Sequence, residues 1–395
     1  VADFLPVAPE FHQRTHRVRL RNLGTADKKS SHKIKHKKIP RVHDKRKGGI
    51  TMEQKQSKIR WGLLGAGNIL HRWMKGARQL EDMEIVAVSS RSRERAQQMA
   101  ETFAIPDALT YEEMMERKDI DVVYIPVPHP AHKELAVSAM RAGKAVLVEK
   151  PAGINARELD EMVACAKENN VFFMEAVWTR FFPLIEQLRP YFSENGIGEV
   201  RAISTNFSYR TENPSSRLFD LERAGGGLLD TGVYNLHFNH MILQKNPVLL
   251  TGVASMNTDE MHLPVDEQAA YIAQYDKGEL GMMCSAVRTD MIDTAYIYGT
   301  KGHVILPKFW KPTIAQIVTW EKTEVLKCPV SQRIPGVEDE GYQYELLHVN
   351  QCLREGKKES PVMTWQASHD ILAQCDELRR QWGLVYPQET EQNGN

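Results

Sequence analysis

The sequence predicts an α/β fold, in which a Rossmann-type, doubly wound parallel sheet is followed by an α+β domain with a large open, mostly antiparallel sheet. Residues 58–176 alternate short apolar strands with amphipathic helices, a pattern typical of parallel strands joined by right-handed crossovers. A glycine-rich turn follows the first of these strands. After about residue 176, strand-like segments follow one another without helices, which favours antiparallel pairing.

Each expected element is bounded by a change in hydrophobic periodicity or by turn residues. In the first part, the expected strands are 58–64, 84–90, 121–128, 145–151 and 171–176, and the expected helices are 68–80, 92–103, 110–117, 130–143 and 156–170. In the second part, the expected strands are 201–210, 248–257, 269–276, 280–288 and 294–300, and the closing helices are 341–356 and 365–383. We therefore expect a first domain at 52–176, a second at 177–387 whose last helix could pack back on the first, and a tail at 388–395.

The composition of the 395-residue chain restricts its class and its surroundings. Its five cysteines are odd in number and never spaced C-x-x-C, which is evidence against a disulfide framework or a structural zinc site. This pattern favours a reducing, cytoplasmic location. No apolar run reaches the length of a membrane span, so we expect no membrane partner.

The first 51 residues differ from the rest of the chain. They carry 14 Lys/Arg and 4 Asp/Glu, a net charge of +10, and they lack helical or strand periodicity. A nucleic-acid-binding arm and a transit peptide are possible interpretations. We favour a non-native leader, because the chain begins with Val1 and Met52 precedes the first strand. The remaining residues carry a net charge of −10, so we expect no nucleic-acid partner.

The segment "GAGNIL" has the position of a phosphate-binding turn. Gly65 and Gly67 lie between a strand and a helix, where the first allows a tight turn and the second allows close approach of a pyrophosphate. Asn68 and Ile69 follow at the helix start. Leu70 replaces the third glycine of the dinucleotide motif, which weakens the motif taken alone.

The end of the second strand predicts which dinucleotide binds. Sites for NAD usually place an acidic residue there, whereas this chain has Ser90 followed by Arg91, Arg93 and Arg95. Arginine binds a 2′-phosphate through charge-assisted hydrogen bonds. We expect Ser90, Arg91 and Arg95 to contact NADP, and Arg93 to be a solvated residue at a helix start.

The segment "AVLVEKPAGI" places two charged residues at the end of a buried strand. A buried charge costs free energy unless it has a partner or a function. Glu149 and Lys150 hold this position, and Pro151 restricts Lys150 to extended conformations. A lysine at the carboxyl end of a parallel strand faces the crevice where ligands bind. The alternative role for Lys150 is a structural ion pair with Glu149.

The segments "VPHPAHKELA", "VEKPAGIN" and "GGGLLDTGVY" resemble the glucose–fructose oxidoreductase/inositol dehydrogenase (Gfo/Idh/MocA) family over about residues 58–387. The segments "MEAVWTRFFP" and "KKESPVMTWQASHDILAQCDELRR" are similar to its branch of dimeric dihydrodiol dehydrogenases and NADP-dependent D-xylose 1-dehydrogenases. The resemblance implies an oxidoreductase that transfers hydride between NADP and a secondary or hemiacetal hydroxyl of a sugar, polyol or trans-dihydrodiol. It also implies a homodimer.

The resemblance further implies roles for individual residues. Lys150, often before a cis proline bond, would lie beside the nicotinamide and the reacting hydroxyl. Tyr234 would be the acid/base, with its pKa lowered by Lys150, and Asp230 would orient Lys150 or the substrate. The residues that it assigns to the cofactor are Pro128, His129, His132, Glu149, Lys150, Trp178 and Arg180.

Other readings of these residues stay open at this point. Tyr234 could be a core aromatic and Asp230 a helix cap, and His237 is expected in the core or behind the site. His129 and His132 lack a third ligand nearby in the sequence, so we expect no metal. Alternative functions are an NAD(H)-dependent inositol or sugar dehydrogenase, a ketose reductase, or a non-catalytic dinucleotide-binding regulator.

Overall fold

The computed structural model describes residues 57–213, 215–257, 264–328 and 341–391. The basic leader, residues 1–51, lies outside the described residues, so the expectations for it stay predictions. A short helix, α10 (Pro387–Glu391), begins at the last residue of the expected second domain and continues into the expected tail.

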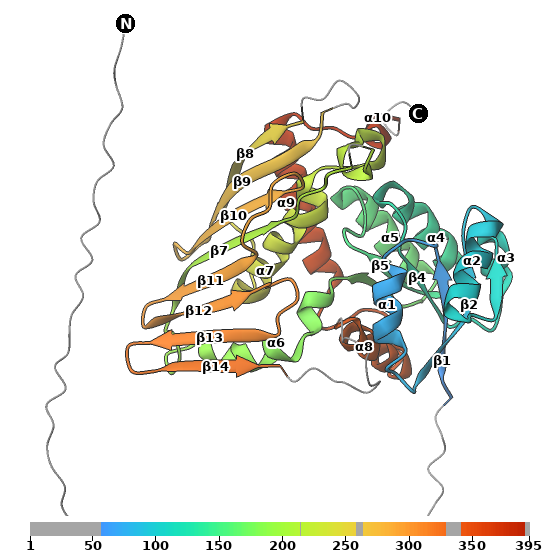
Figure 1. Ribbon diagram of the computed structural model, residues 1–395, viewed down its shortest axis with the longest axis horizontal. Helices are drawn as coiled ribbons and strands as arrows, with labels where there is room; N and C mark the ends of the chain where they lie inside the picture. Colours follow the sequence, from blue (N-terminus) through green and yellow to red (C-terminus); the bar gives the residue numbers. More distant parts are fainter. Residues whose placement is uncertain (1–56, 214, 258–263, 329–340, 392–395) are drawn as a thin grey trace, which may run out of the picture. The chain divides into compact units, whose positions relative to one another are not determined.

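The first sheet has six parallel strands in the order β3-β2-β1-β4-β5-β6, which confirms the expected Rossmann-type sheet (Figure 1). Its strands are β1 (Ile59–Leu64), β2 (Met83–Ser89), β3 (Asp107–Leu109), β4 (Val122–Ile125), β5 (Ala145–Glu149) and β6 (Phe173–Ala176). The three-residue β3 was not predicted, because it is too short to show an apolar period. The central strands are buried, as expected for strands covered on both faces.

Helices follow the strands of this sheet in chain order. They are α1 (Leu70–Ala77), α2 (Arg93–Phe103), α3 (Tyr111–Glu116), α4 (His132–Arg141) and α5 (Ala156–Glu168). Side-chain caps fix several of their starts. Ser92 accepts from the Arg95 backbone N–H, and Thr110 forms a reciprocal capping box with Glu113.

The second sheet has eight strands in the order β14-β13-β12-β11-β7-β10-β9-β8. They are β7 (Val200–Ser208), β8 (Leu249–Met256), β9 (Asp266–Gln274), β10 (Leu280–Ala286), β11 (Thr294–Gly299), β12 (Gly302–Pro307), β13 (Ile314–Thr319) and β14 (Thr323–Lys327). β7 and β10 pair in parallel and the other neighbours pair antiparallel, so the predicted mostly antiparallel sheet is confirmed. The sequence reading missed β12, β13 and β14.

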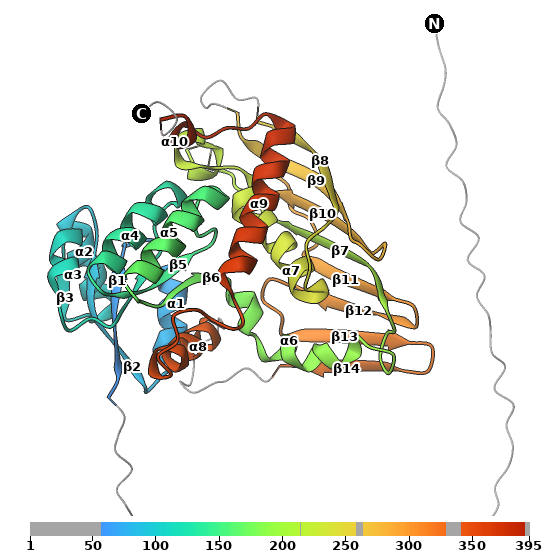
Figure 2. The ribbon, with the colours of Figure 1, turned by 180° about the vertical axis from the view of Figure 1, so that it is seen from behind.

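Helices lie over one face of the second sheet, as Figure 2 shows. α7 (Val233–Leu243) contacts β7 and β10, and α9 (Trp365–Trp382) contacts β8. α9 also contacts α5, and α8 (Tyr342–Arg354) contacts α1, so both closing helices pack against the first sheet's helices. The shorter α6 (Pro183–Leu188) contacts β14.

Candidate active site

Lys150 lies directly after β5, and its ammonium group is directed toward the start of α7. Its Nζ donates to the backbone carbonyl of Asp230 at 2.7 Å and lies 3.6 Å from the Asp230 carboxylate. It also lies 5.1 Å from the centroid of the Tyr234 ring. The Lys150–Pro151 peptide bond is cis, as the resemblance implies. The three residues predicted to be catalytic therefore lie together.

Glu149 does not take the ammonium of Lys150 as its hydrogen-bond partner. One of its carboxylate oxygens accepts from the hydroxyl of Tyr124, and the other accepts from the Lys150 backbone N–H at 3.2 Å. Burial raises the pKa of Glu149. The ammonium of Lys150 is therefore directed to Asp230 and not to a local ion pair with Glu149.

Asp230 lies in a single π-helical turn, Leu228–Gly232, and its carboxylate is surrounded by donors. Arg217 Nη2 donates to its Oδ1 at 2.9 Å, and the Tyr209 hydroxyl donates to its Oδ2. Burial alone would raise the pKa of Asp230, but the charges of Lys150 and Arg217 hold it well below its usual range. The carboxylate is therefore a fixed negative charge beside Lys150.

The glycines before Asp230 fix the path of this turn. Gly226 has φ +104°, and a Cβ there would lie 2.1 Å from the Asp266 Oδ1. The other oxygen of Asp266 accepts from the Leu228 backbone N–H at 2.6 Å. A side chain at Gly226 would push away the carboxylate that holds the turn, so the glycine run serves to position Asp230.

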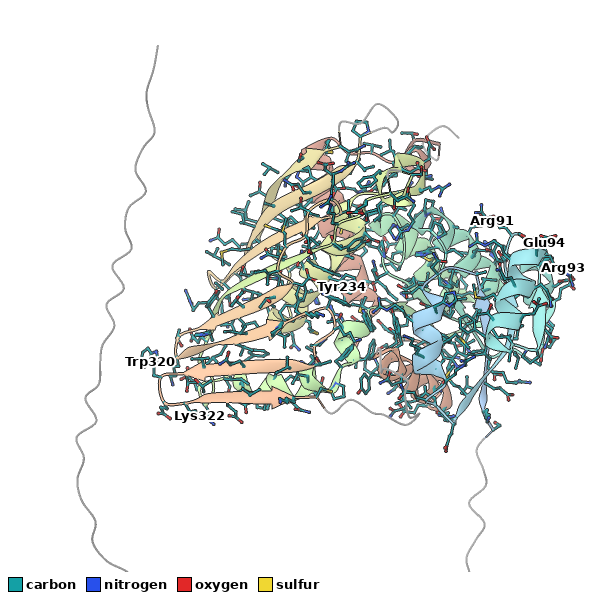
Figure 3. All side chains as sticks on the ribbon, in the orientation of Figure 1. Arg91, Arg93, Glu94, Tyr234, Trp320 and Lys322 are labelled. Carbon is teal, nitrogen blue, oxygen red and sulfur yellow. The ribbon has the colours of Figure 1, made fainter. Side chains whose placement is uncertain are left out.

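Tyr234 lies between the two sheets (Figure 3), and its hydroxyl has a partner other than Lys150. Trp178 Nε1 donates to the Tyr234 hydroxyl at 3.2 Å, whereas Lys150 lies over the ring face. Burial, followed by the negative charge of Glu149, raises the pKa of Tyr234 well above its ordinary value. This shift is opposite in direction to the lowering expected from Lys150, whose Nζ lies 5.1 Å from the ring centroid.

The glycine turn after β1 has no room for side chains. A Cβ on Gly65, whose φ is +137°, would lie 2.6 Å from Val127, and a Cβ on Gly67 would lie 2.6 Å from the Pro126 carbonyl. Asn68 is exposed and Ile69 is the N-cap of α1. The close backbone approach fits a turn that receives a pyrophosphate.

The residues after β2 lie next to this turn. Ser90 is buried, Arg91 is exposed, and Arg95 Nη2 donates to the Ala66 carbonyl of the glycine turn at 3.2 Å. Burial raises the pKa of Tyr111, and the nearby charges of Arg91 and Arg95 oppose that shift, so both arginines lie near one phenol. Arg93 instead pairs with Glu113 at 2.8 Å, as a solvated surface residue would (Figure 3).

The comparisons with known proteins are consistent with this geometry. Residues 59–177 match the "Oxidoreductase family, NAD-binding Rossmann fold", and residues 185–305 match the "GFO/IDH/MocA C-terminal domain". The trans-1,2-dihydrobenzene-1,2-diol dehydrogenase of Mus musculus is 36% identical over 335 residues, 84% of this chain and 99% of that protein. The chain belongs to the Gfo/Idh/MocA oxidoreductase family. The predicted resemblance is confirmed, and the cofactor of this family fold is a nicotinamide dinucleotide.

Further relatives and structures agree with the family assignment. The trans-1,2-dihydrobenzene-1,2-diol dehydrogenase of Homo sapiens is 34% identical, over 84% of this chain and 99% of that protein. A 3-ketoreductase from Actinomadura kijaniata, solved with NADP and TDP-benzene, has a TM-score of 0.74 at 22% identity, over 82% of this chain and 98% of that one. An aldose-aldose oxidoreductase from Caulobacter crescentus has a TM-score of 0.72 at 20% identity, over 82% and 97% of the two chains. These two structures show a shared fold.

The loop after β4, which the family resemblance assigns to the cofactor, holds two buried histidines. His129 Nδ1 lies 3.2 Å from the Ala224 carbonyl, just before the glycine run, and Pro128 precedes it. His132 lies with its two ring nitrogens 2.8 Å from the Pro151 and Val127 carbonyls. Burial lowers the pKa of His129 well below its ordinary value and that of His132 to about 4. Both rings therefore connect backbone segments around Lys150.

Trp178 and Arg180 differ from each other in placement. Trp178 reaches Tyr234 and stacks on Tyr342, with ring centroids 4.3 Å apart. Arg180 Nη2 instead donates to His237 and His240, at 3.3 and 3.4 Å. The predicted position of Arg180 at the nicotinamide is therefore corrected: its side chain lines a pocket formed with α7 and α9.

The sequence analysis did not single out three residues that lie near the site. Tyr209 and Arg217 bind Asp230, and Glu175 lies 3.7 Å from His237, as expected for a histidine behind the site. Tyr209 and Arg217 are 13 or more residues from Asp230 in sequence, so their spacing does not show that they meet it. Glu175 lies in the strand β6, where it reads as an ordinary strand residue.

The described residues lack two kinds of feature. Over these residues, no helix is both long enough and apolar enough to span a bilayer. Over the same ranges, no cluster of three or more His, Cys, Asp or Glu side chains has an arrangement suited to a metal ion.

Proposed function

We propose that this protein is an NADP-dependent dehydrogenase or reductase that acts on a trans-dihydrodiol, or on a secondary or hemiacetal hydroxyl of a sugar or polyol. The observation that carries this proposal is the convergence of Lys150, Asp230 and Tyr234, with Lys150 Nζ 2.7 Å from the Asp230 carbonyl and 5.1 Å from the Tyr234 ring centroid. The names of the mouse and human relatives support the diol as substrate class.

The choice of NADP over NAD rests on the residues after β2. Ser90 lies where NAD-binding sites usually have a carboxylate that would repel a 2′-phosphate. Arg91 and Arg95 lie near Tyr111, and Arg95 also reaches the glycine turn that would hold the pyrophosphate. The two guanidinium groups can therefore hold a 2′-phosphate while the backbone of 65–67 binds the neighbouring phosphates.

The site's own residues can bind and polarise a hydroxyl or carbonyl oxygen. When bound, the nicotinamide supplies or accepts the hydride. Lys150 offers an ammonium whose position is fixed by Asp230, so it can donate a hydrogen bond to the substrate oxygen and stabilise developing negative charge. Tyr234, with its raised pKa, stays protonated at neutral pH, so its hydroxyl can donate a hydrogen bond to that oxygen.

We also propose that the protein is a cytoplasmic homodimer. All five cysteines are free, and four of them are buried, which fits a reducing compartment. The strands β8, β9 and β10 expose large apolar side chains, namely Leu249, Val253, Ile272, Leu280 and Met282. An exposed apolar sheet of this kind favours a self-complementary, two-fold interface.

The decisive test is NADP⁺ reduction, followed by absorbance, over a panel of trans-diols, aldoses and polyols, with NAD⁺ in parallel. We expect turnover of a trans-dihydrodiol or an aldose such as D-xylose, with NADP⁺ preferred. Preference for NAD⁺ would overturn the assignment of Arg91 and Arg95. A protein that binds NADPH tightly and turns over no member of the panel, in either direction, would contradict the enzymatic proposal.

A further inference from the structure

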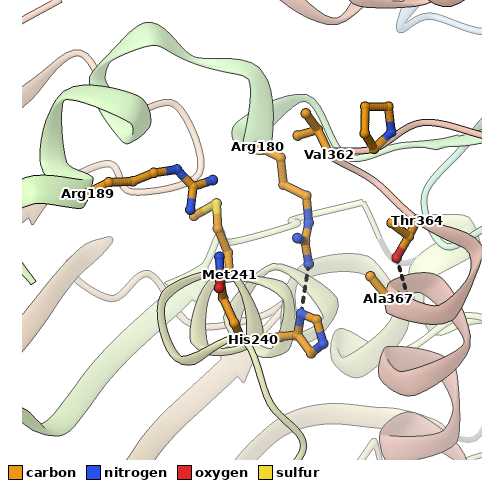
Figure 4. A pocket seen from close by; sticks show the side chains of 9 residues that line it. Arg180, Arg189, His240, Met241, Val362, Thr364 and Ala367 are labelled. Carbon is orange, nitrogen blue, oxygen red and sulfur yellow. Dashed lines mark hydrogen bonds between the residues drawn. The ribbon is translucent and has the colours of Figure 1, made fainter.

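A separate pocket of about 240 Å³ lies beside α7 and the start of α9 (Figure 4). Its polar lining residues are Arg180, Arg189, His240, Gln244 and Thr364, and the others are apolar. Neither Asp nor Glu is among the residues that line it. The lining of this pocket is therefore cationic, with two guanidinium groups and no carboxylate.

Arg180 is a buried charge that forms no direct ion pair among the described residues. Burial lowers its pKa more than the carboxylate of Glu175 raises it. The side chain of Arg180 is 7% exposed, and its Nε is buried with no hydrogen-bond partner in the described structure. Burial lowers the pKa of Arg180 to about 10, so the guanidinium stays charged at neutral pH. A buried charge costs several kcal/mol unless it is paired, so the position is unfavourable without an anion.

The two histidines that bind Arg180 do not neutralise it. A guanidinium can only donate, so the Nδ1 atoms of His237 and His240 must accept from Arg180. With Nδ1 accepting, each neutral imidazole carries its proton on Nε2, which lies 3.7 Å from Glu175 in His237 and 3.6 Å from Asp370 in His240. The imidazoles thus place two uncharged rings between Arg180 and the nearest carboxylates.

The other polar groups of the pocket add to its positive potential. Arg189 reaches the pocket from the segment after α6, so both guanidinium groups line it, and the Nε of Arg189 also pairs with Glu186 at 2.9 Å. Thr364 is the N-cap of the 18-residue helix α9, so the positive end of that helix dipole opens beside the guanidinium groups. Two arginines and a helix start are groups that bind phosphate oxygens.

We propose that this pocket is a binding site for a phosphate-class oxyanion, either inorganic phosphate or the phosphoryl group of a small metabolite. The pocket volume of about 240 Å³ admits such a group with few additional atoms and is below that of sites for larger cofactors. The anion supplies the negative charge that Arg180 lacks, and Arg189 contributes the second guanidinium.

The pocket connects to the active site through a short chain of contacts. Arg180 donates to His237, which faces Glu175, and Glu175 accepts from the Ala152 backbone N–H at 3.0 Å. Ala152 is two residues beyond Lys150. An anion that draws Arg180 into the pocket would weaken its contact with His237, so occupancy should alter the turnover of a substrate bound at Lys150.

The test is a calorimetric titration of the full chain with inorganic phosphate, with NADP⁺ at saturating concentration so that phosphate cannot enter the nucleotide cleft. Wild type should bind one phosphate at millimolar concentration or below. Arg189→Gln should weaken binding at least about tenfold, the effect of losing one charge-assisted contact. Arg380→Gln is the matched control, because Arg380 and Arg189 each form an i,i+3 surface ion pair, with Glu377 and Glu186, and Arg380 is outside the pocket.

Three outcomes would overturn the proposal. They are absence of phosphate binding by wild type both with and without NADP⁺, equal affinities for wild type and Arg189→Gln, and binding that occurs only in a parallel titration without NADP⁺. The last would assign the phosphate to the nucleotide cleft. Because the effect of Arg189→Gln is measured by heat and not by turnover, the anion site can be confirmed even if the proposed dehydrogenase activity fails.

Discussion

Two cations, the partly buried Lys150 and the buried Arg180, follow neighbouring strands of the first sheet and have different electrostatic surroundings. Lys150 comes directly after β5 and lies 3.6 Å from the carboxylate of Asp230. Arg180 comes shortly after β6 and binds two neutral imidazoles. The same sheet edge thus holds one cation whose charge is balanced and one whose charge is not.

This difference indicates which ligands the two places can take. At Lys150 the negative charge is already present, and Asp230 also binds Arg217, so a neutral, hydroxyl-bearing substrate can enter without adding charge. At Arg180 an uncharged ligand would leave the guanidinium unbalanced, whereas an oxyanion would balance it. Burial alone therefore does not show which ligand a lysine or arginine binds. The charges of the groups around the side chain do.

The largest expected effect comes from removing the balanced cation. Lys150→Met keeps the length of the side chain but removes the ammonium that binds the substrate oxygen. We expect turnover to fall by roughly three orders of magnitude, because the contact strengthens in the transition state. Binding of NADPH, measured by fluorescence, should change little. If turnover by Lys150→Met equals that of wild type, Lys150 has no part in the chemistry.

Removing the counter-charge should have the next largest effect. Asp230→Asn leaves Lys150 and Arg217 without their carboxylate, so we expect the free energy of unfolding to fall by roughly 3–5 kcal/mol at pH 7. Because the pKa of Asp230 is depressed in the folded state, its contribution is present above about pH 4 and declines as the pH falls further. The difference between the variant and wild type should therefore shrink in acid.

Chemical denaturation of both proteins at neutral and acidic pH measures this difference. Asp276→Asn is the control, because it breaks an exposed pair with Lys245 and should change the stability far less. A constant difference between Asp230→Asn and wild type across the pH range would contradict the ion-pair account.

The sequence predicted the centre at Lys150 better than the pocket at Arg180. The segments around Lys150, Asp230 and Tyr234 carry the family resemblance, which implied one site for all three, although no helix was predicted around Asp230 and Tyr234. The same resemblance assigned Arg180 to the cofactor. Whether its side chain turns to the cleft or to α7 depends on where His237 and His240 lie, and spacing along the chain does not determine that.

The fold shows the same limit. Five of the six strands of the first sheet were predictable, because they are apolar runs separated by helices, and only the three-residue β3 was missed. β13 and β14 were not, because their exposed faces alternate with buried ones over only six and five residues. The parallel pairing of β7 with β10 was also beyond the sequence, since α7, β8 and β9 lie between these strands along the chain.

Arg91 and Arg95 form a third cationic site, which is exposed to solvent. Removing its charges should have the smallest effect of the three sites. Replacing both Arg91 and Arg95 by Ala removes the guanidinium groups proposed to hold the 2′-phosphate, so the dissociation constant of NADPH should rise roughly 10- to 100-fold. Affinity for NADH should stay the same, because NADH lacks that phosphate. Arg93→Ala is the matched control on the same helix, since Arg93 pairs with Glu113. Equal losses for both cofactors in the double variant would show that these arginines support the fold of α2, and the cofactor preference would then need another source.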